Sequence, residues 1–257
     1  MRAVDKLAQN RTFAITLGAA TIVGVFVLLE ILLRVGIVNK YIVPLPSQVL
    51  FSLERIVMEE KILSRVRETA FEMLVACSAV IVIGVPIGSL LYKWVALRRA
   101  ILDWVAAMAA APLVLAFPLF LVMFGRSPTT VIVMSTITGL APIIIKTTEG
   151  LLGVRPVLIN VGKSLKMTEK QMFWKILLPA ALPTIFSGIR LSWTFVLISV
   201  VGIEFLINLG GLGQLINDLA ERYDLPGTYA AIGFVILVSV AFFVILERVE
   251  TWLRPVK

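Results

Sequence analysis

The chain has 257 residues, of which 59% are apolar and 16% are charged, and its formal net charge is +8. A water-soluble domain of this length cannot bury so much apolar surface, so the composition predicts a membrane protein. The basic residues are spread between apolar runs instead of gathering on one polar face, which argues against a nucleic-acid partner.

Hydropathy predicts six membrane-spanning helices, because each crossing of a ~30 Å hydrocarbon layer takes ~20 apolar residues. They cover residues 12–35, 69–92, 100–124, 127–148, 180–207 and 228–250. Arg2, Lys6 and Arg11 precede the first run, which is too long for the apolar region of a signal peptide and lacks a small-residue cleavage site. We therefore expect an uncleaved first span.

The predicted fold class is all-α, a polytopic bundle in which residues 1–65 hold the first span and an interfacial helix and residues 66–257 form the core. Most of the 24 basic residues fall on the side of the two termini. The positive-inside rule then places both termini in the cytoplasm, and an even number of spans agrees with this.

Between the first two spans, Pro44, Pro46 and Ser47 interrupt the chain before an amphipathic run. Apolar residues then recur at helical spacing at Val49, Leu50, Leu53, Ile56 and Val57. We expect an interfacial helix on the outer side, with a bracing role favoured over ligand contact.

In the third predicted span, Pro112 and Pro118 remove backbone donors at membrane depth. This is tolerated only where protein or a wet cavity satisfies the freed carbonyls. Either the helix is broken and lines a translocation pathway, with Pro112, Phe117 and Pro118 as candidate residues, or the prolines make a packing kink.

The polar segment before the fifth span predicts a helix, a turn and a second helix. Pro156 suits the first turn of a helix, and Thr168 and Gln171 have the spacing of a capping box that starts a new one. Pro179 is expected to end the second helix.

The stretch that follows Pro156 carries Lys163, Lys166 and Lys170 at spacings of three and four, hence on one face. Val161 and Leu165 fall opposite, so we expect them to rest on the bundle while the lysines meet water or a partner. Simple anchoring of the lysines to anionic lipid is the alternative.

Arg190 and Glu204 are the ionisable residues placed most firmly within an apolar span, where an unpaired charge costs at least ~2.5 kcal/mol. Each should have a partner or a wet cavity. They are candidates for a pathway or gating pair, and a structural salt bridge or interfacial anchoring is the favoured alternative.

The glycines after Asn208 permit a sharp reversal of the chain. A short helix should follow, with one apolar face formed by Leu212, Leu215, Ile216, Leu219 and Ala220.

The segment from Asn160 to Pro183 resembles the coupling loop of binding-protein-dependent ABC importer permeases, whose pattern runs E-A-A, three residues, Gly, then nine residues to I-x-L-P. Its end matches at Ile176, Leu178 and Pro179, and Lys163, Ser164 and Leu165 stand where relatives commonly read R-S-L. Its head departs, because Asn160, Val161 and Gly162 replace E-A-A and Lys166 replaces the turn glycine.

Other stretches resemble the sulfonate, taurine, nitrate and hydroxymethylpyrimidine branch of that family, in the expected order. They are residues 44–49 (PLPSQV), 84–88 (GVPIG), 111–125, 188–191 (GIRL), Glu204 and 210–216 (GGLGQLI).

The resemblance implies the permease subunit of an ATP-driven importer in the cell inner membrane, with 66–257 as the permease core and 155–178 as the coupling loop. It implies two ABC ATPase subunits, a second permease as homodimer or heterodimer, and an extracytoplasmic solute-binding protein. The implied ATPase-coupling residues are Asn160, Val161, Gly162, Lys163, Ser164, Leu165, Lys166 and Met167. The candidate surface for the binding protein is Asn217, Asp218, Glu221 and Arg222, with a merely solvated face as the alternative.

The implied solute is a small organic anion, sulfonate-like, taurine-like or nitrate-like, or a small heterocycle such as a pyrimidine. We expect no enzyme activity and no cofactor in this chain, with ATP and Mg²⁺ bound by the partner. Gly162, Lys163 and Ser164 imitate the end of a phosphate-binding loop, but Val157 occupies its first glycine position and no strand precedes it. The lone Cys77 and the absence of histidine leave no zinc site.

Two other classes stay open. An ion-driven secondary carrier would need inverted repeats and charged residues at the midplane. A membrane scaffold would use the lysines only as an anchor.

Overall fold

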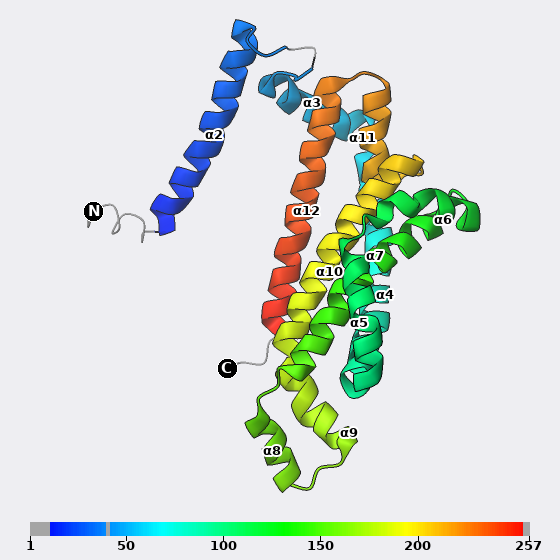
Figure 1. Ribbon diagram of the computed structural model, residues 1–257. Helices are drawn as coiled ribbons and strands as arrows, with labels where there is room; N and C mark the ends of the chain where they lie inside the picture. Colours follow the sequence, from blue (N-terminus) through cyan, green and yellow to red (C-terminus); the bar gives the residue numbers. More distant parts are fainter. Residues whose placement is uncertain (1–10, 40–41, 254–257) are drawn as a thin grey trace. The chain divides into compact units, whose positions relative to one another are not determined.

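In the computed structural model, which describes residues 11–39 and 42–253, all regular elements are helices (Figure 1). Arg2 and Lys6, which contribute to the predicted orientation, lie outside this part of the chain. The described residues divide into a first unit, up to Ile62 together with Asp218–Phe234, and a second unit, Leu63–Asn217 together with the residues from Val235 onward.

The first unit contains α2 (Arg11–Val35) and α3 (Pro46–Glu59). Ser47, in the first turn of α3, donates to the Glu30 carboxylate of α2 from its backbone N–H (3.1 Å) and from its hydroxyl (2.9 Å). The predicted helix after the first span is thus confirmed. Its inward face is narrower than expected, because Ile56 is buried whereas Leu50 and Val57 are exposed.

The second unit is built on long helices joined by short ones. Its elements are α4 (Ile62–Lys93), α5 (Val95–Ala110), the 3-10 helix η1 (Leu113–Ala116), α6 (Phe117–Phe124), α7 (Pro128–Leu152), α8 (Pro156–Ser164), α9 (Glu169–Met172), the π-helix η2 (Phe173–Leu177) and α10 (Leu178–Ile207). Two further helices, α11 (Gly211–Glu221) and α12 (Leu225–Leu253), belong partly to each unit.

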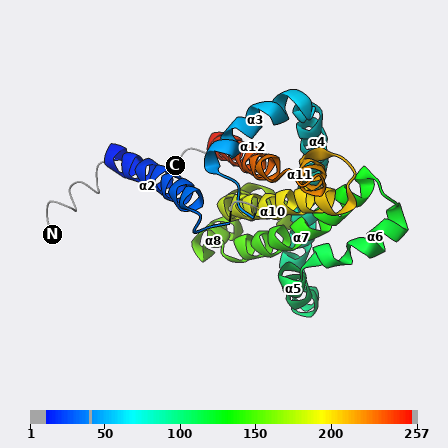
Figure 2. The same cartoon turned by 90° about the horizontal axis from the view of Figure 1, so that it is seen from above.

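Small residues let α7 lie close against α10, side by side in both views (Figures 1 and 2). A Cβ on Gly139 would come within 2.7 Å of Val196, and one on Gly188 within 2.6 Å of Lys146. On the other side of α7, a Cβ on Gly88 of α4 would lie 2.6 Å from Thr147. Close backbone approach of this kind is how membrane helices gain packing energy.

In the described part of the chain, five helical runs are long and apolar enough to cross a membrane: Thr16–Val35, Ile62–Lys93, Pro128–Leu152, Glu169–Ile207 and Leu225–Ile245. The predicted third span is broken, as one of the two alternatives for Pro112 and Pro118 has it, because the chain bends by 88° between Ala110 and Leu113. Ala111 is extended and Pro112 starts the 3-10 turn, while Pro118 sits in the first turn of α6, where its missing N–H costs no helical bond. Counting this bent pair as one span gives six.

Candidate functional site

A basic hairpin, residues 156–177, precedes α10, and Figure 1 shows it at the end of that helix. Its first arm, α8, begins with Pro156 in the first turn after the extended Arg155. Its turn is closed by backbone bonds from Leu165 to Val161 (3.0 Å), Lys166 to Lys163 (2.9 Å) and Met167 to Gly162 (3.0 Å). The predicted helix and turn are therefore present.

The second arm starts with the predicted capping box. The Thr168 hydroxyl accepts from the Gln171 N–H (3.3 Å), and the Gln171 side-chain oxygen accepts from the Thr168 N–H (3.0 Å). This reciprocal pair satisfies two donors that the helix itself leaves free.

Pro179 does not end the second arm, which corrects the expectation from the sequence. The chain stays helical from Glu169 to Ile207, because a five-residue π-helix, η2, leads directly into the first turn of α10. At that position the missing N–H of Pro179 is tolerated. The basic hairpin is thus continuous with a membrane-spanning helix.

The side of α8 that packs inward is also different from the prediction. Gly162 is buried against the second arm, and a Cβ there would lie 2.5 Å from Met172 Cε and 2.8 Å from Ile176 Cδ1. Val161 and Leu165 are exposed, by 49% and 65%. The absence of a side chain at Gly162 decides which face can approach.

The exposed face of the hairpin is therefore apolar and basic at once. Five large apolar side chains are open to solvent, namely Val157, Leu158, Val161, Leu165 and Trp174. The lysines that the sequence singles out, Lys163, Lys166 and Lys170, are exposed on the same hairpin. Such a surface can receive a protein partner with an apolar groove.

One ion pair joins the hairpin to α4. Lys93 in the last turn of α4 lies 3.2 Å from the Glu169 carboxylate at the start of α9. Both side chains are largely exposed, so the pair orients the hairpin more than it stabilises it.

Arg190 and Glu204 do not pair with each other, as a gating pair would require. They are fourteen positions apart on α10, which is about 21 Å at the helical rise. Arg190 is exposed, whereas Glu204 is buried, with 1% of its surface accessible. Glu204 accepts hydrogen bonds from the Thr69 hydroxyl (3.0 Å) and the Gly213 N–H (2.8 Å), so a salt bridge is not what holds it.

The proline candidates lie together at the bend between α5 and α6. Pro112 and Pro118 are exposed, and Phe117 is half-buried. Phe117 packs against the main apolar core of the second unit. Their assignment to a pathway stays a prediction.

The helix α11 has the predicted buried face, formed by Leu212, Leu215 and Leu219. Among the polar residues predicted to dock a partner, Asn217 and Asp218 are half-buried and Glu221 and Arg222 are exposed. No contact in the structure tests that role.

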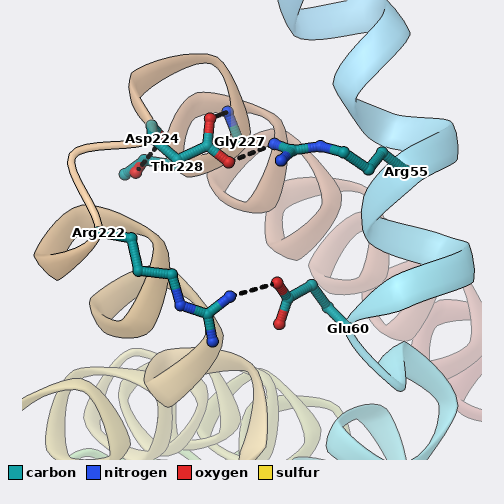
Figure 3. Close-up of polar contacts among 6 residues, drawn as sticks. All are labelled: Arg55, Glu60, Arg222, Asp224, Gly227 and Thr228. Atoms are coloured by element: carbon teal, nitrogen blue, oxygen red, sulfur yellow. Dashed lines mark hydrogen bonds and ion pairs between the residues drawn. The ribbon is translucent and has the colours of Figure 1, made fainter.

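In the first unit Arg222 donates to the Glu60 carboxylate at the end of α3, over 2.7 Å (Figure 3). Beside it, Arg55 is bonded to Asp224, which also accepts from the Gly227 N–H (3.1 Å). The hydrogen bond that the Arg55 guanidinium donates to the Asp224 carboxylate raises the pKa of Arg55. These two bridges hold the turn before α12 against α3, and sequence reasoning missed both.

The bundle and its hairpin define a polytopic membrane component of a transport system. The family model described as "Binding-protein-dependent transport system inner membrane component" matches residues 80–255, and the chain belongs to this family. It is therefore a multi-pass inner-membrane protein and the permease component of an ABC importer, as the resemblance of the coupling loop implied.

Curated relatives agree with this family. The chain is 22% identical to the taurine transport system permease protein TauC of Escherichia coli, over 94% of this chain and 90% of that one. It is 24% identical to the formylaminopyrimidine transport permease protein ThiX of Halalkalibacterium halodurans, over 68% and 70%. It is 29% identical to the nitrate import permease protein NrtB of Synechococcus elongatus, over 57% and 50%.

Solved structures confirm the fold. The inward-facing MetNI methionine ABC transporter aligns with a TM-score of 0.65 and 23% identity, over 76% of this chain and 96% of that one. An amino acid ABC transporter aligns with a TM-score of 0.63 and 18% identity, over 78% of this chain and 98% of that one. The fold is that of a type I ABC importer permease, with all its regular elements helical in the described residues.

Proposed function

We propose that this chain forms the solute pathway of an ATP-driven importer and is moved by a separate ATPase that grips the basic hairpin. The observation that carries this is the exposed apolar face of α8. Val157, Leu158, Val161 and Leu165 lie outside the predicted membrane spans and stay open to solvent. A partner that covers them gains the free energy of apolar burial.

The hairpin is connected so that a partner bound to α8 can move α10. Gly162 locks the two arms together, and the second arm runs without a break into α10. A force on α8 is thereby applied to a helix whose other end leads into α11. A partner that binds the hairpin differently in two nucleotide states biases the pore by that difference in affinity.

The same hairpin surface supports a proposal for the orientation of the chain in the membrane and for its partner subunits. The density of lysine in the hairpin supports a cytoplasmic position for it and for both termini. The proposed assembly holds two ATPase subunits, which bind ATP and Mg²⁺, and a second permease subunit, either a copy of this chain or a less altered homologue. A solute-binding protein docks at the opposite side, on Asn217, Asp218, Glu221 and Arg222 of α11 and the following turn.

The solute class rests on the relatives. Their names assign them taurine, formylaminopyrimidine and nitrate. We place the solute of this chain among small organic anions, taurine-like or nitrate-like, and small heterocycles such as a pyrimidine. The Pro112, Phe117 and Pro118 bend is the proposed lining.

Co-purification tests the proposal against an ion-driven carrier. Tagged chain, extracted from its own membrane in mild detergent, is expected to bring down a stoichiometric ATPase whose hydrolysis is stimulated by the bound permease. A chain that purifies alone and drives ion-dependent uptake in vesicles is the opposite result, and it assigns the protein to the carriers.

A further inference from the structure

The N-terminus of α11 is held by side chains from two other helices of the second unit. Its first three N–H groups donate to Glu68 Oε2 (Gly211, 2.9 Å), to Thr69 Oγ1 (Leu212, 2.8 Å) and to Glu204 Oε2 (Gly213, 2.8 Å). The Thr69 hydroxyl in turn donates to Glu204 Oε2 over 3.0 Å. The free donors at the start of α11 are thereby used by α4 and α10.

Glycine is needed for this arrangement. A Cβ on Gly213 would lie 2.6 Å from the Cβ of Glu204, and a Cβ on Gly211 would overlap the Glu204 carboxyl. Gly211 also has φ of +73°, which favours glycine. The carboxyl of Glu204 therefore reaches the helix end only because the chain has no side chain at these two positions.

A second carboxyl adjoins this one. Glu72 lies on α4 one turn after Glu68, has 6% of its surface accessible, and its carboxyl interacts with that of Glu204. Two ionised carboxylates are both acceptors only, so a bond between them requires a proton on one of the two.

Two buried side-chain oxygens that lack a hydrogen-bond partner in the described structure belong to Glu72 and Glu204. These atoms are Glu72 Oε2 and Glu204 Oε1. They belong to the two carboxyls that contact each other. One proton between these carboxyls satisfies both oxygens and leaves the pair with a single negative charge.

We propose that Glu72 and Glu204 bind one proton between them, and that this proton locks the N-terminus of α11 onto α4 and α10. Of the described titratable groups, Glu68 also acts on the pair from α4, while α10 presents Glu204 and α11 presents its N–H groups. Loss of the proton leaves three carboxylates around one helix end. The lock is therefore closed while the proton is bound and released when a rise in pH removes it.

The lock sits at the end of α10 opposite the basic hairpin. Its release frees the reversal between α10 and α11 while leaving the hairpin intact, because none of the groups in the lock belongs to residues 156–177. The inference is thus independent of the ATPase partner and adds a proton-sensitive element to the permease.

Infrared difference spectroscopy tests the proton directly. The full chain in lipid nanodiscs is expected to show the carbonyl stretch of a protonated carboxyl, which disappears as the pH is raised. Glu72→Gln keeps a donor in place of the proton, so it should lose this band and still fold. Glu68→Gln, a matched change one turn away, should retain the band.

Thermal unfolding of the same samples supplies the second readout. The Tm of the wild-type chain should fall by about 3 °C per pH unit over the range in which the native pair still holds the proton and the unfolded chain has lost it, because the native state there binds more protons than the unfolded state. Glu72→Gln should remove this fall and Glu68→Gln should keep it. A wild-type chain without the band, a Glu72→Gln chain that retains it, or an alkaline Tm restored by sodium but not by choline each overturns the proposal.

Discussion

Gly162 of α8 lies so close to Met172 of α9 that a Cβ would meet Met172 Cε at 2.5 Å. The family pattern has a small residue, the second alanine of E-A-A, at this position. The departure at the head of the coupling loop therefore changes charge, since Asn160 replaces an acidic residue, but it keeps the close packing of the two arms.

Gly162→Leu should separate the arms of the hairpin. Overpacking of this kind costs about 1–3 kcal/mol, and the strain falls on the contact of α8 with Met172 and Ile176. We expect ATPase co-purification to drop severalfold while the spans remain folded by circular dichroism. Gly202→Leu is the matched control, because a Cβ there meets nothing within 4 Å. Equal loss in both variants would count against the packing argument.

Leu165→Asp combined with Lys166→Asp should uncouple ATP hydrolysis from uptake without unfolding the bundle. Both side chains are exposed, so the folded state loses little, while a partner that covers them meets two new charges. Uptake and hydrolysis are measured together in vesicles that contain the whole importer.

The control for that double variant uses the same residue types elsewhere. Lys61 has φ of +50°, like Lys166, and Leu63 is 81% exposed. Lys61→Asp with Leu63→Asp therefore repeats the chemistry far from the hairpin in sequence and should leave coupling intact. Full uptake by the Leu165 and Lys166 double variant excludes the hairpin as the coupling element.

The features that depend on residues close together in the sequence were predicted correctly. Long apolar runs fix the spans, and Thr168 and Gln171 form the capping box that their spacing indicates. The helix with Leu212, Leu215 and Leu219 on one face is also present.

The features that depend on distant residues were not predicted correctly. Thr69, which bonds to Glu204, is 135 positions away, so Glu204 looked like half of a charge pair on its own helix. The orientation of α8 depends on the fit of Gly162 against Met172, which helical periodicity does not contain. The sequence did contain a signal for this orientation. Gly162 is a glycine inside an amphipathic helix, and such a position can accept a bulky side chain such as Met172 from the second arm.

Lys166→Gly should stabilise the hairpin turn. Lys166 has φ of +50°, a conformation that costs a residue with a Cβ about 1–2 kcal/mol and costs glycine little. We expect slower hydrogen exchange of the Met167 and Leu165 amides, which close the turn. Lys170→Gly is the control, since glycine inside α9 should speed exchange. Lys166→Val should also speed it, because a β-branched residue fits this conformation poorly.

The salt bridge between Glu60 and Arg222 should contribute only a small amount to the free energy of unfolding. The two groups are 2.7 Å apart, but the arginine side chain is 59% exposed, so solvent screens the attraction. A double-mutant cycle with Glu60→Gln and Arg222→Gln is expected to give a coupling of about 0.5 kcal/mol that shrinks as salt is raised. A parallel cycle on Arg55 and Asp224 should give the larger value, because Asp224 is also fixed by the Gly227 N–H. Equal couplings in the two cycles would show that the turn before α12 is not organised around Asp224.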